Sequence, residues 1–191
     1  MEIPPLLLAS GSPQRRKLLG LLGVPFQLAG SLPFEERTER DNRALSPHEF
    51  AWHNALGKAR AAARLFPRRR ILAADTTVSL GGRIFGKPRD RADAAATLRT
   101  LAGRRHTVQT AVVLVLPDGR ERSAVTSSHV LFHPLSDARI ARYLDAVDVM
   151  DKAGSYAVQE QGDSLIADVR GSLTNVIGLP LETVAAVLRA A

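Results

Sequence analysis

The first residues that could do chemistry lie near the amino terminus, in the stretch 10–16, which reads SGSPQRR. An apolar run ends there, and Ser12 followed by Pro13 is typical of a helix start. Free backbone N–H groups at a helix start attract an anion. Because Ser10, Ser12 and Arg15 add further donors, the stretch predicts a phosphate-binding turn. An ordinary strand-to-helix turn with solvated arginines fits the same letters.

A carboxylate, Asp75, directly follows the apolar run 71–74. We expect this run to be a buried strand that delivers Asp75, Thr76 and Thr77 at its carboxyl end, where open α/β sheets bind ligands. There, Asp75 could bind a divalent cation or take a proton from water. The alternative is an aspartate that only caps a turn.

Two lysines and an acidic loop could complete such a site. Lys87 stands between Gly86 and Pro88, and a lysine on a stiff loop can face a polyphosphate as a point charge. Lys58 falls in a predicted helix, where a surface lysine is the alternative. Glu35 and Glu36 lie in a polar loop and could add a metal-binding carboxylate, unless the loop is simply solvated.

Other chemistries lack their residues. The chain has no cysteine, which excludes thiol catalysis and Cys-ligated zinc. Its five histidines show no H-E-x-x-H motif, and His129 and His133, although four residues apart, lie at the end of a predicted strand and not on one face of a helix. No G-x-S-x-G, Walker or G-x-G-x-x-G motif occurs. What remains is phosphate chemistry with carboxylates, lysines and a hard cation such as Mg²⁺.

Composition is consistent with one domain over residues 1–191. The net charge is +7, from 26 Lys and Arg against 19 Asp and Glu. The densest basic run, 68–70, has no interleaved aromatics to stack on bases, so we expect a solvated loop and no nucleic-acid partner. The amino terminus lacks the pattern of a signal peptide, and no apolar stretch approaches the ~20 residues of a membrane span.

The elements that must position these residues alternate between helices and strands. We expect helices over 13–22, 47–65, 91–101 and 136–146 and from residue 180, on the basis of caps, prolines and apolar periodicity. We expect strands over 6–9, 24–29, 71–74, 107–116, 121–132, 164–169 and 175–177. Hairpins are expected at Gly81-Gly82 and Asp118-Gly119. The order predicts an α/β fold with a mixed sheet.

Three stretches together resemble the Maf family, in the order expected for it. They are LLLASGSPQRRKLLGLLGVPF, AADTTVSLGGRIFGKPRDRADAAATLRTLAGRRHTVQTAV and DKAGSYAVQEQGDSLIADVRGSLTNVIGLPLETV. The resemblance implies a fold similar to that of inosine triphosphate pyrophosphatases, with an elongated mixed sheet and two lobes around a central cleft. It also implies hydrolysis of a nucleoside triphosphate to the monophosphate and pyrophosphate, with Mg²⁺ or Mn²⁺.

The resemblance assigns roles to particular residues. Residues of catalysis and the metal are Asp75, Lys58, Lys87 and Glu36, with Asp75 as proton acceptor, metal ligand or both. Residues of the phosphate turn are Ser10, Ser12 and Arg15. Residues tied to substrate choice are Gln14, Thr76 and Gln159, and the last two look like the branch that acts on dTTP and UTP.

Two positions depart from the family pattern. Gln14 stands where the dTTP/UTP branch usually has arginine, which predicts a broader choice of base. Gly57 stands where the family helix usually has glutamate before its lysine, and glycine weakens a helix by about 1 kcal/mol relative to alanine. Two rival functions stay open: an enzyme that removes modified nucleotides, and a basic nucleic-acid-binding or cell-division module. The resemblance further implies a homodimer, and we expect a cytoplasmic protein.

Overall fold

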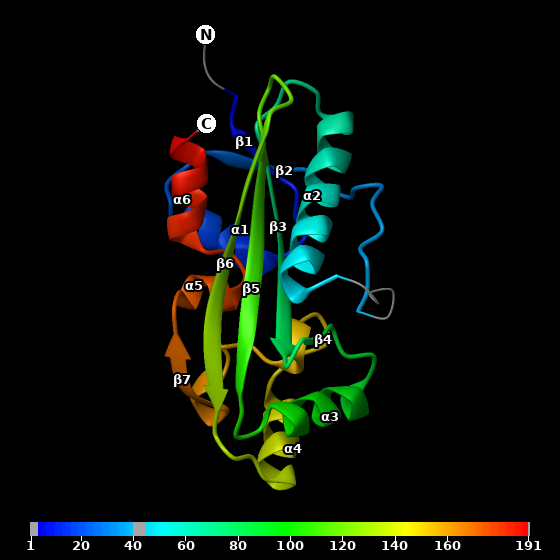
Figure 1. Ribbon diagram of the computed structural model, residues 1–191, viewed down its shortest axis with the longest axis vertical. Coiled ribbons are helices and arrows are strands. Elements are labelled where there is room, and N and C mark those ends of the chain that lie inside the picture. Colours follow the sequence, from blue (N-terminus) through cyan, green and yellow to red (C-terminus); the bar gives the residue numbers. More distant parts are fainter. Residues whose placement is uncertain (1–3, 40–44, 191) are drawn as a thin grey trace.

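A mixed β-sheet forms the centre of the molecule (Figure 1). The structure is a computed structural model, and it describes residues 4–39 and 45–190. Within these residues the strands are β1 (Leu6–Leu8), β2 (Phe26–Leu28), β3 (Ile71–Leu80), β4 (Arg83–Phe85), β5 (Arg105–Val115), β6 (Glu121–Phe132) and β7 (Ile166–Arg170). Their order is β2-β1-β3-β5-β6-β7, with β4 paired to β3. β1 is parallel to β2 and β3, and the other pairs are antiparallel, which confirms the predicted mixed sheet.

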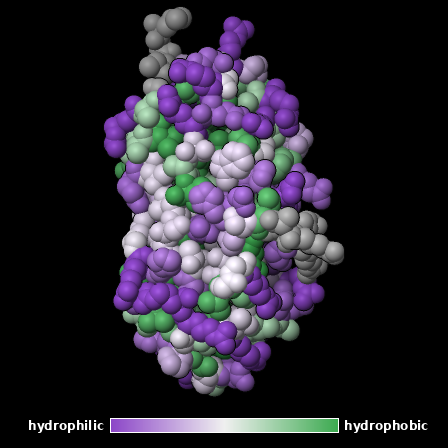
Figure 2. All heavy atoms as spheres, in the orientation of Figure 1, coloured by the Kyte–Doolittle hydropathy of each residue, from purple (hydrophilic) through white to green (hydrophobic). Residues whose placement is uncertain are grey.

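Helices cover the sheet at both of its ends. They are α1 (Pro13–Gly20), α2 (Pro47–Leu65), α3 (Arg91–Leu101), α4 (Asp137–Ala146), α5 (Leu173–Ile177) and α6 (Leu181–Arg189), with short 3₁₀ turns η1 (Ala153–Ser155) and η2 (Gly162–Ser164). Figure 1 shows an elongated molecule with α2 and α6 flanking one end of the long strands and α3 and α4 at the other. Strongly hydrophilic side chains gather at both ends, with residues of intermediate hydropathy between them (Figure 2).

Three apolar clusters make up the core. At one end of the sheet, alanines of α2 pack on β3 and β5 from one face, and α1 and α6 pack on the same strands from the other face. At the other end, Phe132 of β6 lies in a cluster with apolar residues of α3 and with Tyr143 of α4. Because side chains alternate along a strand, Ile71 and Ala73 of β3 belong to the α2 cluster, and Leu72 and Ala74 to the α1–α6 cluster.

Several predicted elements are confirmed. α2 begins with the predicted capping box, in which Ser46 accepts a hydrogen bond from the Glu49 amide and the Glu49 carboxylate accepts one from the Ser46 amide. Ser12, Asp90 and Ser136 cap their helices as expected. β6 has the predicted bounds, and β5 begins two residues earlier than predicted.

Two predictions about strands are wrong. β3 does not stop at residue 74; it continues to Leu80, because β5 pairs with it from Ile71 to Ser79 and its β-branched residues suit a strand. Asp75 therefore lies within the strand and not at its end. Residues 175–177 belong to helix α5, which Ser172 caps by accepting from the Asn175 amide.

Smaller differences concern element ends. α1 stops at Gly20 and not at residue 22, and the first two strands are shorter than predicted. β7 lies about two residues later than predicted. In the parts of the chain that the structure describes, no helix is long and apolar enough to cross a membrane.

Candidate active site

The candidate site lies where β1 ends and β3 continues past it. β1 pairs with β3 only through Leu7 with Ile71 and Leu8 with Leu72, so the following residues of β3 have no β1 partner. The turn after β1 carries Ser10 and leads into α1. By the alternation of the strand, Asp75 points to the α2 face of the sheet and Thr76 to the α1–α6 face.

An ion-paired chain occupies the α2 face. Lys58 Nζ lies 2.6 Å from Asp75 Oδ1 and 3.0 Å from Glu36 Oε1. The side chains of Lys58 and Asp75 are each 9% exposed, whereas that of Glu36 is 47% exposed. The chain of three charges is therefore buried at Asp75 and open to solvent at Glu36. Loss of Lys58 would leave the buried Asp75 carboxylate without its ion-pair partner, which is strongly destabilising, whereas loss of the Asp75 charge would leave Lys58 paired with Glu36.

A hydrogen-bond network occupies the other face, around the guanidinium of Arg15. Its Nε donates to the carbonyl of Gly178 at 2.9 Å, its Nη2 to Thr76 Oγ1 at 3.0 Å and its Nη1 to Ser10 Oγ at 3.3 Å. Ser10 Oγ also accepts from the Ser12 amide at 3.2 Å, and Ser12 caps α1 through the Arg15 amide at 3.4 Å. These bonds fix the turn that the sequence predicted as a phosphate site.

The network continues into the sheet through Thr110 and Asn175, two residues that sequence reasoning missed. Thr110 Oγ1 lies 2.9 Å from Thr76 Oγ1 and donates to the Asn175 carbonyl at 3.2 Å. Both residues are fully buried, and the Asn175 amide donates to the carbonyl of Val108 and to Ser128 Oγ. The one feature of the sequence that could have indicated Thr110 and Asn175 is that each is a polar residue next to an apolar run.

The two faces share one electrostatic field. Burial alone would raise the pKa of Glu36, but Lys58, by charge and hydrogen bond, and then Lys87 and Arg15 hold that pKa below its ordinary value. Burial lowers the pKa of the Arg15 guanidinium, while the charges of Asp75 and Glu36 raise it. Lys87 itself is exposed on the loop after β4. The structure thus brings Lys58, Asp75 and Glu36 into direct contact and places Arg15 and Lys87 near enough for their charges to act on Glu36.

The predicted specificity residues are placed in different surroundings. Thr76 belongs to the Arg15 network. Gln14 is half-buried in the first turn of α1, and Gln159 is exposed between η1 and η2. Their roles in substrate choice stay predictions.

The carboxylates at the site suit a hard cation that also takes ligands from a substrate. Among residues 4–39 and 45–190, no group of three or more His, Cys, Asp and Glu side chains is placed to hold a metal ion. Asp75 and Glu36 meet at the Lys58 ammonium, which already occupies a position between two carboxylates. One or two carboxylates plus substrate phosphates is the arrangement that Mg²⁺ prefers.

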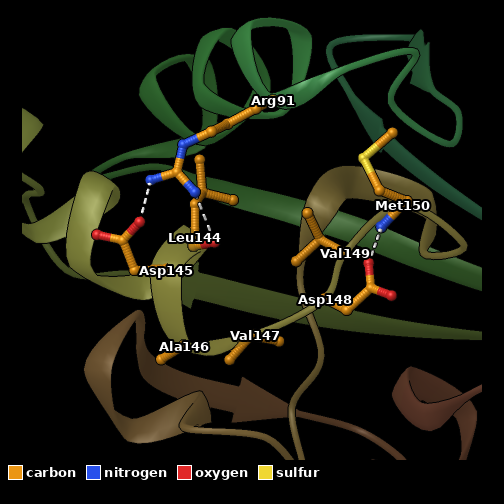
Figure 3. A pocket seen from close by; sticks show the side chains of 8 residues that line it. All are labelled: Arg91, Leu144, Asp145, Ala146, Val147, Asp148, Val149 and Met150. Atoms are coloured by element: carbon orange, nitrogen blue, oxygen red, sulfur yellow. Dashed lines mark hydrogen bonds and ion pairs between the residues drawn. The ribbon is translucent and has the colours of Figure 1, made fainter.

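A separate pocket of about 350 Å³ lies at the α3–α4 end of the molecule (Figure 3). Its lining residues are Arg91, Leu144, Asp145, Ala146, Val147, Asp148, Val149 and Met150, none of which is a predicted site residue. Arg91 is paired with Asp145 at 2.6 Å and also donates to the Leu144 carbonyl. Because Arg91 of α3 bonds to Leu144 and Asp145 of α4, we interpret the pocket as the contact region between these two helices.

Comparison with known proteins places the chain in a family. Residues 5–191 match the sequence model of the family described as "Maf-like protein". The chain is 45% identical over 182 residues to a protein named dTTP/UTP pyrophosphatase from Akkermansia muciniphila, covering 95% of this chain and 94% of the relative. A protein of the same name from Anaeromyxobacter dehalogenans is 44% identical over 191 residues, covering 98% and 94%. A solved dITP/XTP pyrophosphatase from Mycobacterium abscessus aligns with a TM-score of 0.49 at 17% identity, over 96% of this chain and 93% of that one.

Proposed function

The chain belongs to the Maf family, and we propose that it hydrolyses a nucleoside triphosphate, with dTTP and UTP favoured, to the nucleoside monophosphate and pyrophosphate. The observation that carries the proposal is that a buried Lys58–Asp75 pair and the hydrogen-bonded Ser10–Arg15 turn lie on opposite faces of β3, just beyond its pairing with β1 and close enough for the Asp75 charge to act on Arg15. Relatives named dTTP/UTP pyrophosphatase, matched along nearly their whole length, support it.

The phosphates of the substrate meet a set of positive groups. The Gln14 amide at the start of α1 and the Arg15 guanidinium hold one part of the triphosphate, and Lys87 reaches it from its loop. These groups are in place before the substrate arrives, so they stabilise developing negative charge without reorganising. Arg15 in particular cannot swing away without losing three hydrogen bonds.

Asp75 is the group that we propose acts on the attacking water. Its carboxylate is held by Lys58 and points away from the Thr76 network, toward the α2 face. We propose that it accepts a proton from water as the water attacks the α-phosphorus and pyrophosphate leaves. A role as metal ligand is compatible with the same position.

We also propose that a divalent cation, Mg²⁺ or Mn²⁺, binds with the substrate at Asp75 and Glu36. When bound, it would neutralise charge on the phosphate oxygens. Both carboxylates are hard oxygen donors and are near the positive groups that face the phosphates. Homodimerisation and a cytoplasmic location stay predictions.

The test is product analysis with a substrate panel. Purified protein is assayed with the four ribonucleoside and four deoxyribonucleoside triphosphates, with Mg²⁺, with Mn²⁺ and with excess chelator. We expect pyrophosphate as first product, dependence on the cation, and dTTP or UTP among the best substrates. Because Gln14 replaces the usual arginine, other nucleotides should follow within a few tens of fold. Orthophosphate as first product, or full activity in excess chelator, would contradict the proposal.

A further inference from the structure

The segment that carries Glu36 contacts three neighbouring residues on the surface of α2. This segment, residues 32–39, is here termed the acidic loop. Gly57 and Lys58 stand three and four residues after Asn54 along α2, so each of them lies next to Asn54 on the helix surface. Lys58 binds Glu36 of the loop, as described above. The other two positions hold the residues on either side of it.

Asn54 binds the backbone of the loop just after Glu36. Its Oδ1 accepts from the Arg37 amide at 3.0 Å, and its Nδ2 donates to the Arg37 carbonyl at 3.1 Å. Asn54 is only 2% exposed, and a buried amide that lost these partners would be left unsatisfied. The backbone of Arg37 is therefore fixed relative to α2.

Gly57 receives the loop just before Glu36. If Gly57 had a Cβ atom, its three nearest heavy atoms would all belong to the ring of Phe34, and two of them would lie closer than real Cβ atoms tolerate. The ring thus lies on the bare backbone of the helix. Glycine costs a helix interior about 1 kcal/mol relative to alanine, so its presence here weakens α2 and makes room for Phe34.

We propose that Gly57 and Phe34 are positioning residues that hold Glu36 against Lys58. Phe34 fixes the loop on one side of Glu36 and Arg37 fixes it on the other, and the half-exposed carboxylate between them then has little freedom to leave the site. The inference rests on the proposed function, because Glu36 matters through the charges it shares with Lys58 and the substrate. A glycine also precedes the second site lysine, but a Cβ at Gly86 would meet only the flexible end of Glu39, which can move aside.

The variant that tests the proposal is Gly57→Ala. Alanine favours the helix, yet its Cβ displaces the Phe34 ring and with it Glu36. We expect kcat/KM for pyrophosphate release to fall about tenfold, because small misplacements at a site are costly. Phe34→Ala should lose a similar amount, and the double variant should lose no more than either single variant, since both remove one contact.

Gly20→Ala is the matched control, because it makes the same change in a helix where no atom lies within 4 Å of the added Cβ. It should leave kcat/KM unchanged. In a Glu36→Gln background, Gly57→Ala should have no further effect on kcat/KM. An equal loss with and without Glu36 would overturn the proposal, because the effect would not pass through that carboxylate.

Hydrogen exchange at the Arg37 amide gives a readout that does not depend on activity. Exchange should be faster in Gly57→Ala than in the wild type, while Gly20→Ala and the wild type exchange alike. If the wild type releases no pyrophosphate, the proposed function fails, and the exchange rates still decide whether Gly57 and Phe34 fix the loop. Unchanged exchange at Arg37 in Gly57→Ala would overturn the inference.

Discussion

The two faces of β3 build the candidate site in different ways. On the α1–α6 face, Arg15 is held by neutral acceptors, Ser10, Thr76 and the Gly178 carbonyl. On the α2 face, Lys58 is held by two carboxylates, one buried and one on a partly exposed loop. One face thus holds a single guanidinium in a fixed position, and the other holds paired charges whose outer member, Glu36, depends on how a loop docks.

The largest effect should come from the charged face, through Asp75→Asn. The substitution keeps the shape of the side chain and removes its charge. We expect kcat to fall at least ~100-fold, the scale of one general-base or charge-stabilising role. The assay is steady-state pyrophosphate release with dTTP and UTP. Asp168→Asn, which changes a β7 carboxylate paired with Arg105, is the control and should keep kcat. Near wild-type turnover in Asp75→Asn would mean that the site is misplaced.

Arg15→Lys should break the hydrogen-bonded face with a smaller effect. Lysine keeps the positive charge but cannot reproduce three donors in a planar fork. The loss of a charged hydrogen bond is about 2 kcal/mol, so kcat/KM should fall about thirtyfold, mainly through KM. Saturation curves for dTTP measure it. An unchanged KM would show that Arg15 holds the turn together without facing the substrate.

Comparison of Thr110→Val with Thr126→Val separates an effect on the position of Arg15 from an effect on the stability of the sheet. Thr126 pairs with Thr110 in the register of β5 and β6, and its hydroxyl bonds to Thr183 on α6 and not to the Arg15 network. Thr110→Val and Thr126→Val should each lower the free energy of unfolding by about 1 kcal/mol, the value of one hydrogen bond. Only Thr110→Val should also raise KM, by about fivefold. Equal KM values in the two variants would contradict the role given to the network.

The smallest effect concerns pH and the loop carboxylate. The pKa of Glu36 in the folded protein is lowered from its ordinary 4.5, so its stabilising contribution is present above that pH and is lost as pH falls through the folded-state pKa. The wild type should therefore be slightly more stable than Glu36→Gln at neutral pH, and the difference should vanish on acidification. Urea unfolding of both proteins across this range measures it. A difference that does not change with pH would count against the ion pair.

Local signals in the sequence were enough for the parts of the site that depend on neighbours in the chain. Ser12 and Ser46 cap their helices as predicted, because a cap bonds to an amide three residues away. The run of apolar residues before Asp75 correctly indicated a buried strand, and the role of the carboxylate that this strand carries stays a prediction. The types and order of Arg15, Lys58 and Asp75 predicted a shared site, and the structure places Lys58 beside Asp75 and Arg15 beside Thr76.

What the sequence could not predict depends on contacts between distant segments. β3 continues beyond residue 74 because β5 pairs with it, and the residues around position 74 do not predict that pairing. The bond from Arg15 to the Gly178 carbonyl joins residues 163 positions apart. Residues 175–177 looked like a strand, but the cap at Ser172 and the buried amide of Asn175 favour a helix.

The path of oxygen in the reaction tests the central claim most directly. Purified protein is incubated with dTTP and a divalent cation in water labelled with a heavy isotope of oxygen. The products are separated, and mass spectrometry measures the mass of each. If water attacks the α-phosphorus beside Asp75, the heavy oxygen enters thymidine monophosphate and the released pyrophosphate carries none. Label in pyrophosphate, or labelled orthophosphate as the product, would contradict the account.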